Sequence, residues 1–130
     1  MDKNQRAIIA EQEIAKARSF LGNAVTLADL GMWNVVANRV YYALYHAIMA
    51  LMVKDGFSPR THSGLITEFG KEYVLTGKIA PKYSKTLSQM RSIRESCDYD
   101  AFYYTTQEEM SPILEAVTEL LDIIANQLSD

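Results

Sequence analysis

The spacing of apolar residues in the first third of the chain restricts the fold more than any other feature. These residues recur at alternating steps of four and three, as on one face of an α-helix. They are Ala10, Ile14, Ala17, Leu21, Ala24 and Ala28. The pattern predicts a helix over residues 4–30, and Gly31 suits a left-handed C-terminal cap. No stretch shows the two-residue alternation of Val, Ile and Thr that is typical of a strand. The sequence therefore predicts an all-α fold.

The segment over residues 33–54 has apolar residues on every side of a helix. A helix of this kind is expected to be buried at the centre of a bundle. Gly56 is suited to end it in the same way as Gly31 ends the first helix. Two further helices are expected over residues 62–75 and 81–97, the second beginning at Pro81, which fits a first helical turn.

The fifth helix is expected to run from a cap at Thr106 to about Gln127, because Thr106 and Glu109 have capping-box spacing. Pro112 lies inside this pattern, so the helix either bends there or begins at Ser111. Helices joined by short connections predict an up-and-down bundle of four to five helices.

The composition is that of an ordinary globular protein. A chain of 130 residues with 48% apolar and 22% charged residues is expected to form one domain, residues 1–130. There is one cysteine, and there is no Gly-rich phosphate loop, HExxH or EF-hand pattern, so we expect no metal and no cofactor. No signal peptide is evident, and the longest apolar run, residues 40–53, is shorter than the roughly 20 residues of a membrane span. We therefore expect a cytoplasmic protein without membrane contact.

The net charge of −3 is unevenly distributed. From Lys71 to Arg94 there are six basic residues and one acidic residue, whereas from Glu95 onward there are nine acidic residues and no Lys or Arg. Two interpretations remain open. A basic helix and an acidic helix pack close together, or a basic strip is available to nucleic acid.

Two polar residues interrupt the apolar segment 33–54. Arg39 and His46 are seven residues apart, nearly two helical turns, so they project from almost the same line. Tyr42 lies between them on the same face, where its ring is suited to stack a base. Either these residues pair inside the bundle as structural groups, or they form a site.

Arg94 lies on the apolar stripe of the predicted fourth helix, where Asp98 is an available local partner. An arginine in such a position is rarely fully buried unless it is paired. Together with Arg39 and His46 it makes three inward polar groups. We therefore expect a shared cleft, with Tyr42 between Arg39 and His46 and with Arg94 approaching from the fourth helix.

His62 and Ser63 stand at the start of the third predicted helix, where a helix N-terminus favours a phosphate. The alternative is that Thr61 and Ser63 only cap the helix and that His62 is exposed. Tyr41 and Tyr45 are expected in the core, with satisfied hydroxyl groups.

Four stretches, in this order and spacing, resemble the HEPN domain superfamily, and more closely its stand-alone small prokaryotic members. They are "NRVYYALYHAIMALMVKDG", "THSGLITEFGKEYVLTGKI", "RSIRESCDYDAF" and "TQEEM". The resemblance covers nearly the whole chain. It implies an all-α up-and-down bundle and an RNA-directed role, since many such proteins are dimeric, metal-independent endoribonucleases of toxin–antitoxin, CRISPR or antiviral systems.

The resemblance also implies residue roles. The family's composite site carries an Arg-x4–6-His motif from each protomer, and Arg39 and His46 enclose six residues. They are the candidate catalytic residues, with Tyr42, His62, Ser63, Arg94 and Asp98 as candidate substrate-binding residues. The sequence departs from the best-known toxins, in which the motif lies on a late helix and a polar residue follows the arginine.

The resemblance therefore implies two alternative functions. The first is a HEPN homodimer that binds or cleaves RNA in a toxin–antitoxin or defence system. The second is a non-enzymatic nucleotide- or RNA-binding partner of a minimal nucleotidyltransferase.

Overall fold

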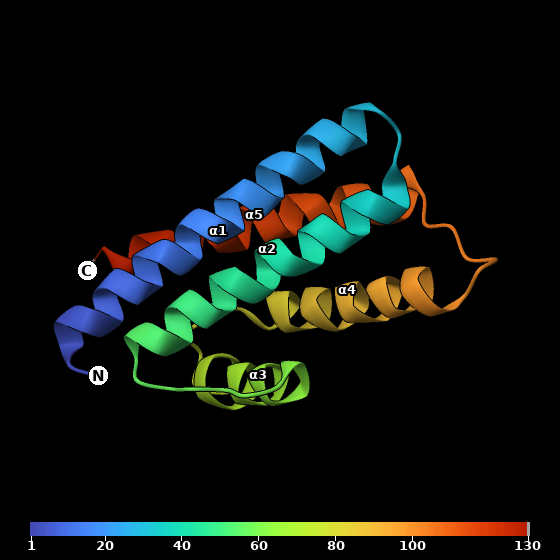
Figure 1. Ribbon diagram of the computed structural model, residues 1–130. Helices are drawn as coiled ribbons and strands as arrows, with labels where there is room; N and C mark the ends of the chain where they lie inside the picture. The colour runs from blue at the N-terminus through green and yellow to red at the C-terminus, as the bar shows by residue number, and fades with distance from the viewer. Residues whose placement is uncertain (130) are drawn as a thin grey trace.

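The computed structural model describes residues 1–129, and these residues form helices joined by short connections (Figure 1). The elements are α1 (Lys3–Asp29), α2 (Trp33–Lys54), α3 (His62–Phe69), the π-helical segment η1 (Gly70–Val74), α4 (Pro81–Tyr99) and α5 (Gln107–Leu128). No strand occurs within the described range. The predicted all-α bundle of helices is therefore confirmed.

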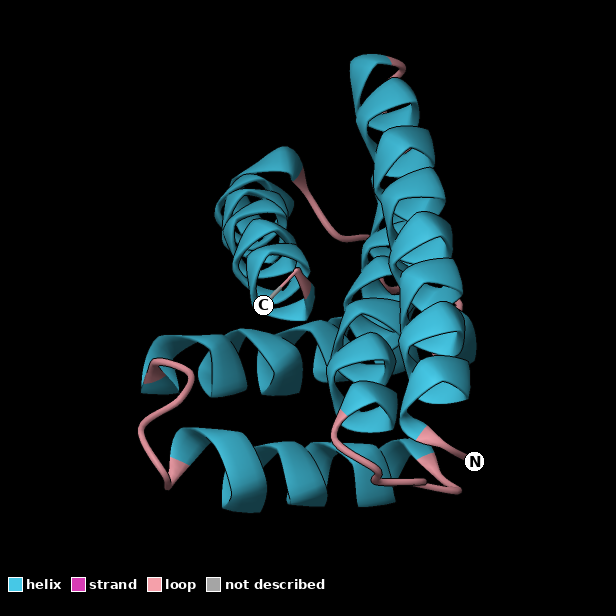
Figure 2. Ribbon diagram, turned by 90° about the vertical axis from the view of Figure 1, so that its left-hand side faces the viewer, coloured by secondary structure: helices cyan, strands magenta, loops and turns pink. Residues whose placement is uncertain are grey.

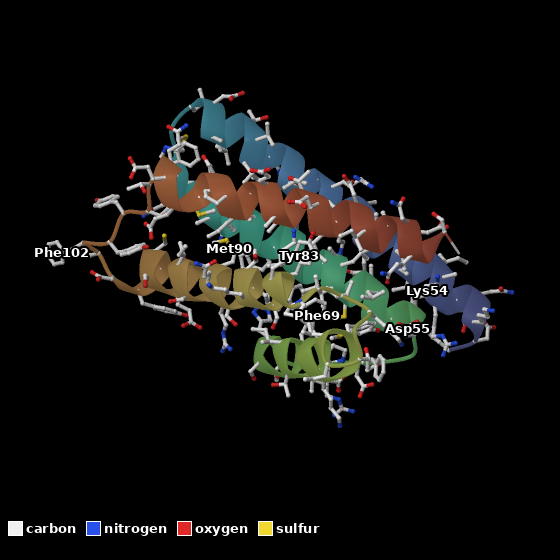
Figure 3. The ribbon with its side chains drawn as sticks, turned by 180° about the vertical axis from the view of Figure 1, so that it is seen from behind. Lys54, Asp55, Phe69, Tyr83, Met90 and Phe102 are labelled. Atoms are coloured by element: carbon white, nitrogen blue, oxygen red, sulfur yellow. The ribbon has the colours of Figure 1, made fainter. Side chains whose placement is uncertain are left out.

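The helix α2 is the centre of the bundle, as predicted. It contacts α1, α3, α4 and α5, and most of its residues from Val36 to Val53 are buried. The helices α1 and α2 form a long antiparallel hairpin, against which α5 packs (Figure 1). Figure 2 shows α3 and α4 running antiparallel to each other and lying across the direction of this hairpin, near its lower end. In Figure 3, Phe69 of α3 and Met90 of α4 lie on the helix sides that face the bundle, and both are fully buried.

The first two helices end where their glycines predict. Gly31 and Gly56 have φ of 71° and 90°, in the left-handed region where a side chain would be strained. Reversal of the chain at Gly31 makes α1 and α2 neighbours along their lengths. That arrangement positions the candidate site.

The third predicted helix, residues 62–75, is right in extent but changes type after Phe69, where η1 begins. Tyr73 on η1 is buried, and its hydroxyl donates to Asp55 Oδ2 at 2.7 Å and to the Leu51 carbonyl at 3.4 Å. Burial, with the nearby Asp55 carboxylate, raises the pKa of Tyr73 far above its usual value. These hydrogen bonds join η1 to the end of α2.

The fifth helix begins at Gln107 and includes Pro112, so the alternative start at Ser111 is wrong. Thr106 caps the helix by accepting from the Glu109 backbone N–H at 3.2 Å. Only this half of the predicted capping box forms. The Glu109 carboxylate instead accepts from the hydroxyl groups of Thr105 and Tyr103, at 3.1 and 3.2 Å. It therefore stabilises the loop before α5.

The helix α4 extends two residues beyond the predicted end and is followed by an exposed loop in which Phe102 points away from the molecule (Figure 3). The helices α4 and α5 contact each other, and Lys82 Nζ lies 3.6 Å from Glu119 Oε1. The interpretation that the basic and acidic helices pack together is confirmed at this contact. Within residues 1–129, no helix has both the length and the apolar character needed to cross a membrane.

Candidate functional site

Arg39 and His46 of α2 meet around a side chain of α1 that the sequence analysis did not single out, Phe20. The His46 ring stacks on the Phe20 ring, with 5.5 Å between centroids and 3° between planes. The Arg39 Cζ atom lies 5.9 Å from the same ring centroid. All three residues are half-buried. Arg39 and His46 therefore share one face of the molecule, with Phe20 between them.

The His46 ring is held by a carboxylate. Its Nδ1 atom lies 2.5 Å from Glu13 Oε2, and only 17% of the His46 side chain and 19% of the Glu13 side chain are exposed. When the ring is neutral, Nδ1–H donates to Glu13 and Nε2 keeps a free lone pair. When the ring is protonated, the contact is an ion pair and Nε2–H is a donor. In both states Glu13 orients the ring and leaves Nε2 for another partner.

Both contacts follow from the register of the α1–α2 hairpin. Glu13 and Phe20 are seven residues apart, as are Arg39 and His46, so each pair lies along one line of its helix. Because the two helices are antiparallel, the direction from Glu13 to Phe20 along α1 is the same as the direction from His46 to Arg39 along α2. One line of α1 therefore supplies a carboxylate to His46 and an aromatic ring to both α2 residues.

Arg39 has a neutral partner. Its Nη1 donates to Asn38 Oδ1 at 2.9 Å, and it forms no ion pair with any residue of the described range. A guanidinium has five N–H donors in a planar arrangement that matches phosphate oxygens. Arg39 therefore retains donors for an anion.

Tyr42 connects this part of the face to Arg94 of α4. Its ring centroid is 5.7 Å from that of Phe20, and the Arg94 Cζ atom lies 5.6 Å from the Tyr42 centroid and 4.9 Å from the Tyr41 centroid. Such cation–π contacts stabilise a guanidinium over an aromatic ring. The expected approach of Arg94 from α4 toward Tyr42 is therefore observed.

Arg94 also lies beside its predicted partner. Its Nε atom is 3.3 Å from Asp98 Oδ2, and 20% of the Arg94 side chain is exposed. The buried Nε–H nevertheless forms no hydrogen bond in the described part of the chain, because proximity alone does not give the required direction. We therefore regard the pair as an electrostatic contact, with the rings of Tyr41 and Tyr42 as the main packing partners of Arg94.

His62 is half-buried against α2, so the alternative that it is an exposed residue is wrong. Its Nδ1 atom lies 2.6 Å from the Tyr41 hydroxyl, and its ring centroid is 4.6 Å from that of Tyr45. Burial lowers the pKa of His62, and the positive charges of Arg94 and Arg91 lower it further.

The capping alternative holds for Thr61, whose hydroxyl accepts from the Gly64 N–H at 2.9 Å. Ser63 is exposed, and its hydroxyl lies 3.3 Å from that of Thr61. Among the predicted binding residues, Ser63 is therefore the one without a recorded contact to the aromatic and cationic side chains of the face.

Tyr45 lies between the two histidines. Its ring is 5.3 Å from that of His46, edge to face, in addition to its contact with His62. Tyr45 is half-buried and packs against the core, whereas Tyr41 is fully inside it, so the predicted core position is confirmed in full for Tyr41 and in part for Tyr45. Burial and then the nearby Glu13 carboxylate raise the pKa of Tyr45. The hydroxyl therefore stays protonated near neutral pH.

We refer to these side chains as the Arg/His face. It contains two imidazoles, two guanidiniums, and the phenylalanine and tyrosine rings that join them: Phe20, Arg39, Tyr41, Tyr42, Tyr45, His46, His62 and Arg94. Residues 1–129 contain no group of three or more His, Cys, Asp or Glu side chains placed to hold a metal ion. The face offers cations, rings and titratable nitrogens for a phosphate-containing ligand.

An all-α bundle with such a face is the class of structure that the sequence predicted. The chain matches the HEPN domain family over residues 10–128, and it belongs to that family. It is 29% identical to a UPF0332 protein of Thermotoga maritima over 98% of this chain and 96% of that protein. It is 26% identical to Putative toxin MJ0142 of Methanocaldococcus jannaschii over 80% of this chain and 71% of that protein. UPF0332 protein PH1297 of Pyrococcus horikoshii is 37% identical over 63% of this chain and 58% of its own length.

Proposed function

We propose that this protein is a toxin-type HEPN protein that cleaves RNA without a metal ion. The observation that carries the proposal is the environment of His46. Its ring is oriented by Glu13, stacked on Phe20 and placed on one face with Arg39, a cation without an acidic partner in residues 1–129. This is the combination that proton transfer at a phosphate ester requires.

The chemistry assigns a task to each group. Attack by the ribose 2′-hydroxyl needs a base for its proton, an acid for the leaving 5′-oxygen and a cation for the charge that develops on phosphorus. His46 presents Nε2 for proton transfer, and Arg39 binds the phosphate oxygens. Tyr42 and Arg94 provide a ring and a charge for the nucleotide. Asp98 holds Arg94, and Ser63 with His62 extends the binding surface along α3.

The similar proteins support the biological setting. One of them, MJ0142, carries a name that describes a toxin. Membership of the family supports a two-fold homodimer, in which one Arg39 and His46 set from each protomer lies on either side of the axis. A toxin–antitoxin or defence system, with a nucleotidyltransferase as the partner protein, is the proposed context.

Nucleotide or RNA binding without cleavage is the second candidate function. Arg94 favours it, because a guanidinium over two tyrosine rings suits recognition of phosphate and base and needs no proton transfer. In this case affinity falls as salt rises, since phosphate contacts are screened.

The test is cleavage of single-stranded RNA by purified protein in the presence of EDTA. We expect products with a 2′,3′-cyclic phosphate. His46→Ala is expected to reduce the rate by about 10²–10⁴-fold, the usual contribution of acid–base catalysis. Arg39→Ala should weaken both cleavage and phosphate binding, with circular dichroism confirming that each variant folds. If wild type and His46→Ala behave alike, or if activity requires Mg²⁺, cleavage is rejected, and retained RNA binding then supports the second candidate.

A further inference from the structure

The Arg/His face holds its two histidines in the same way. His46 is bound at Nδ1 by the Glu13 carboxylate, and His62 is bound at Nδ1 by the Tyr41 hydroxyl. Each contact occupies one ring nitrogen and leaves Nε2 without a partner in residues 1–129. Two histidines fixed in this manner, on different helices, are suited to act on one substrate from two sides.

We infer that His62 and His46 of one chain form an acid–base pair, in which His62 accepts the 2′-hydroxyl proton and His46 donates a proton to the 5′-oxygen. This inference rests on the proposed ribonuclease function. It adds a catalytic residue and divides the proton transfers between two rings. His62 is thereby more than a binding residue.

The separation of the rings suits this role. Both rings pack on Tyr45, with centroid distances of 5.3 and 4.6 Å, so their own centroids are at most about 10 Å apart. The entering and leaving oxygens lie on opposite sides of one phosphorus, and each hydrogen bond to a ring nitrogen adds about 3 Å. One phosphate can therefore bridge two ring nitrogens that are on the order of 9 Å apart or less. The upper bound on the centroid separation is compatible with this span.

The partners of each ring agree with the assigned direction of transfer. Glu13 holds His46 at Nδ1, so Nε2 is the nitrogen that remains for the leaving 5′-oxygen. Burial lowers the pKa of His62, and the charges of Arg94 and Arg91 lower it further, so the neutral ring predominates near neutral pH. A neutral ring accepts a proton. When its Nδ1–H donates to the Tyr41 oxygen, Nε2 carries the free lone pair.

The step balances without a co-reactant. His62 removes the 2′-hydroxyl proton as the 2′-oxygen bonds to phosphorus, and the bond from phosphorus to the 5′-oxygen breaks. His46 gives that oxygen its proton. The products are a 2′,3′-cyclic phosphate and a 5′-hydroxyl, with His62 protonated and His46 neutral. Proton exchange with water restores both rings.

The test compares two substrates that differ in the leaving group. The first is uridylyl-adenosine, whose 5′-oxygen needs a proton to leave. The second is the 4-nitrophenyl ester of uridine 3′-phosphate, whose nitrophenolate leaves without one. Loss of the general acid lowers the cleavage rate of the first substrate only, whereas loss of the general base lowers the rate for both.

We expect His62→Ala to lose about 10²–10⁴-fold on both substrates and His46→Ala to lose that amount on uridylyl-adenosine only. Tyr41→Phe, which removes the hydroxyl partner of His62, should lose several-fold on both. Thr67→Ala is the matched control on α3, because Thr67 is exposed and bonds only to the Ser63 carbonyl. Thermal unfolding checks the fold of each variant.

Three results overturn the inference. If wild type cleaves and His62→Ala matches Thr67→Ala on both substrates, the pair is rejected while the proposed function stands. If His62→Ala cleaves the nitrophenyl ester at the wild-type rate and His46→Ala does not, the assigned roles are wrong. A wild type that cleaves neither substrate rejects the proposed function and the pair together.

Discussion

The two halves of the Arg/His face differ in what holds their histidines. On the α1–α2 side, His46 has an acidic partner and lies between two long helices that pack along their lengths. On the α3–α4 side, His62 has a phenolic partner, faces two arginines and lies at the first residue of an eight-residue helix. Two chemically identical rings therefore lie beside opposite charges. This difference is the basis for assigning them different tasks in the proposed reaction.

The largest expected effect is on the rate of RNA cleavage, when the acidic partner of His46 is removed. Glu13→Gln keeps the shape and a hydrogen bond but removes the charge beside His46. A hydrogen bond to a charged group contributes about 1–1.5 kcal/mol more than a neutral one, so we expect cleavage of RNA to fall by roughly tenfold. Steady-state rates with uridylyl-adenosine measure the effect. Unchanged rates would show that the Glu13 charge has no part in the reaction at His46.

A smaller effect is expected on the stability of α3 and η1, the segments that carry His62, when their attachment to α2 is weakened. Tyr73→Phe removes the hydroxyl that bonds to Asp55 and Leu51, at a cost of about 1 kcal/mol. Because that bond joins η1 to α2, hydrogen exchange should become faster in α3 and η1 than in the α1–α2 hairpin. Uniform faster exchange in all helices would contradict the separate attachment of the two halves.

The smallest effect concerns the titration of His62. Arg94→Gln removes the positive charge that has the larger effect on the pKa of His62. This pKa should therefore rise toward its usual value near 6.5. Arg91→Gln should give a smaller rise, because Arg91 is the lesser cause. NMR titration of the ring resonances measures both. A fall in the pKa in either variant would contradict the account.

The same shift has a consequence for stability. A folded-state pKa below the unfolded value means that the unfolded chain binds the proton more readily. This contribution to stability is present above about pH 6.5 and is lost as the pH falls through the folded pKa. Arg91, Arg94, Tyr41 and Tyr45 are the charged and titratable groups recorded around the ring. Urea unfolding between pH 7.5 and 5.5 should therefore show a smaller loss for Arg94→Gln than for wild type.

Much of the fold was predictable because the helices of this chain have clear local signals. Apolar periodicity, Gly31 and Gly56 predict the α1–α2 hairpin. The switch to η1 after Phe69 was not predicted, nor was the hydrogen bond that Tyr73 on η1 makes to Asp55 at the end of α2. A tertiary hydrogen bond of this kind leaves no periodic pattern in the sequence.

The candidate site was predictable only within one helix. The seven-residue spacing of Arg39 and His46 places them on one line, but their partners lie on α1, 33 residues before His46 in the case of Glu13. The identical spacing of Glu13 and Phe20 was a usable signal, since antiparallel packing brings two such lines together. His62 and Ser63 are neighbours in sequence, but His62 packs against α2 whereas Ser63 is exposed. This difference depends on tertiary packing and cannot be read from the sequence.

In the proposed reaction, both halves of the face bind one phosphate. The most direct measurement is an NMR titration with 2′-deoxyuridylyl-adenosine, which lacks the attacking hydroxyl and stays intact. The ring resonances of His46 and His62 are followed together. The account predicts that both shift with the same dissociation constant, and that Arg39→Ala weakens both responses equally. Shifts of one ring only, or of two rings with different dissociation constants, would contradict a single site.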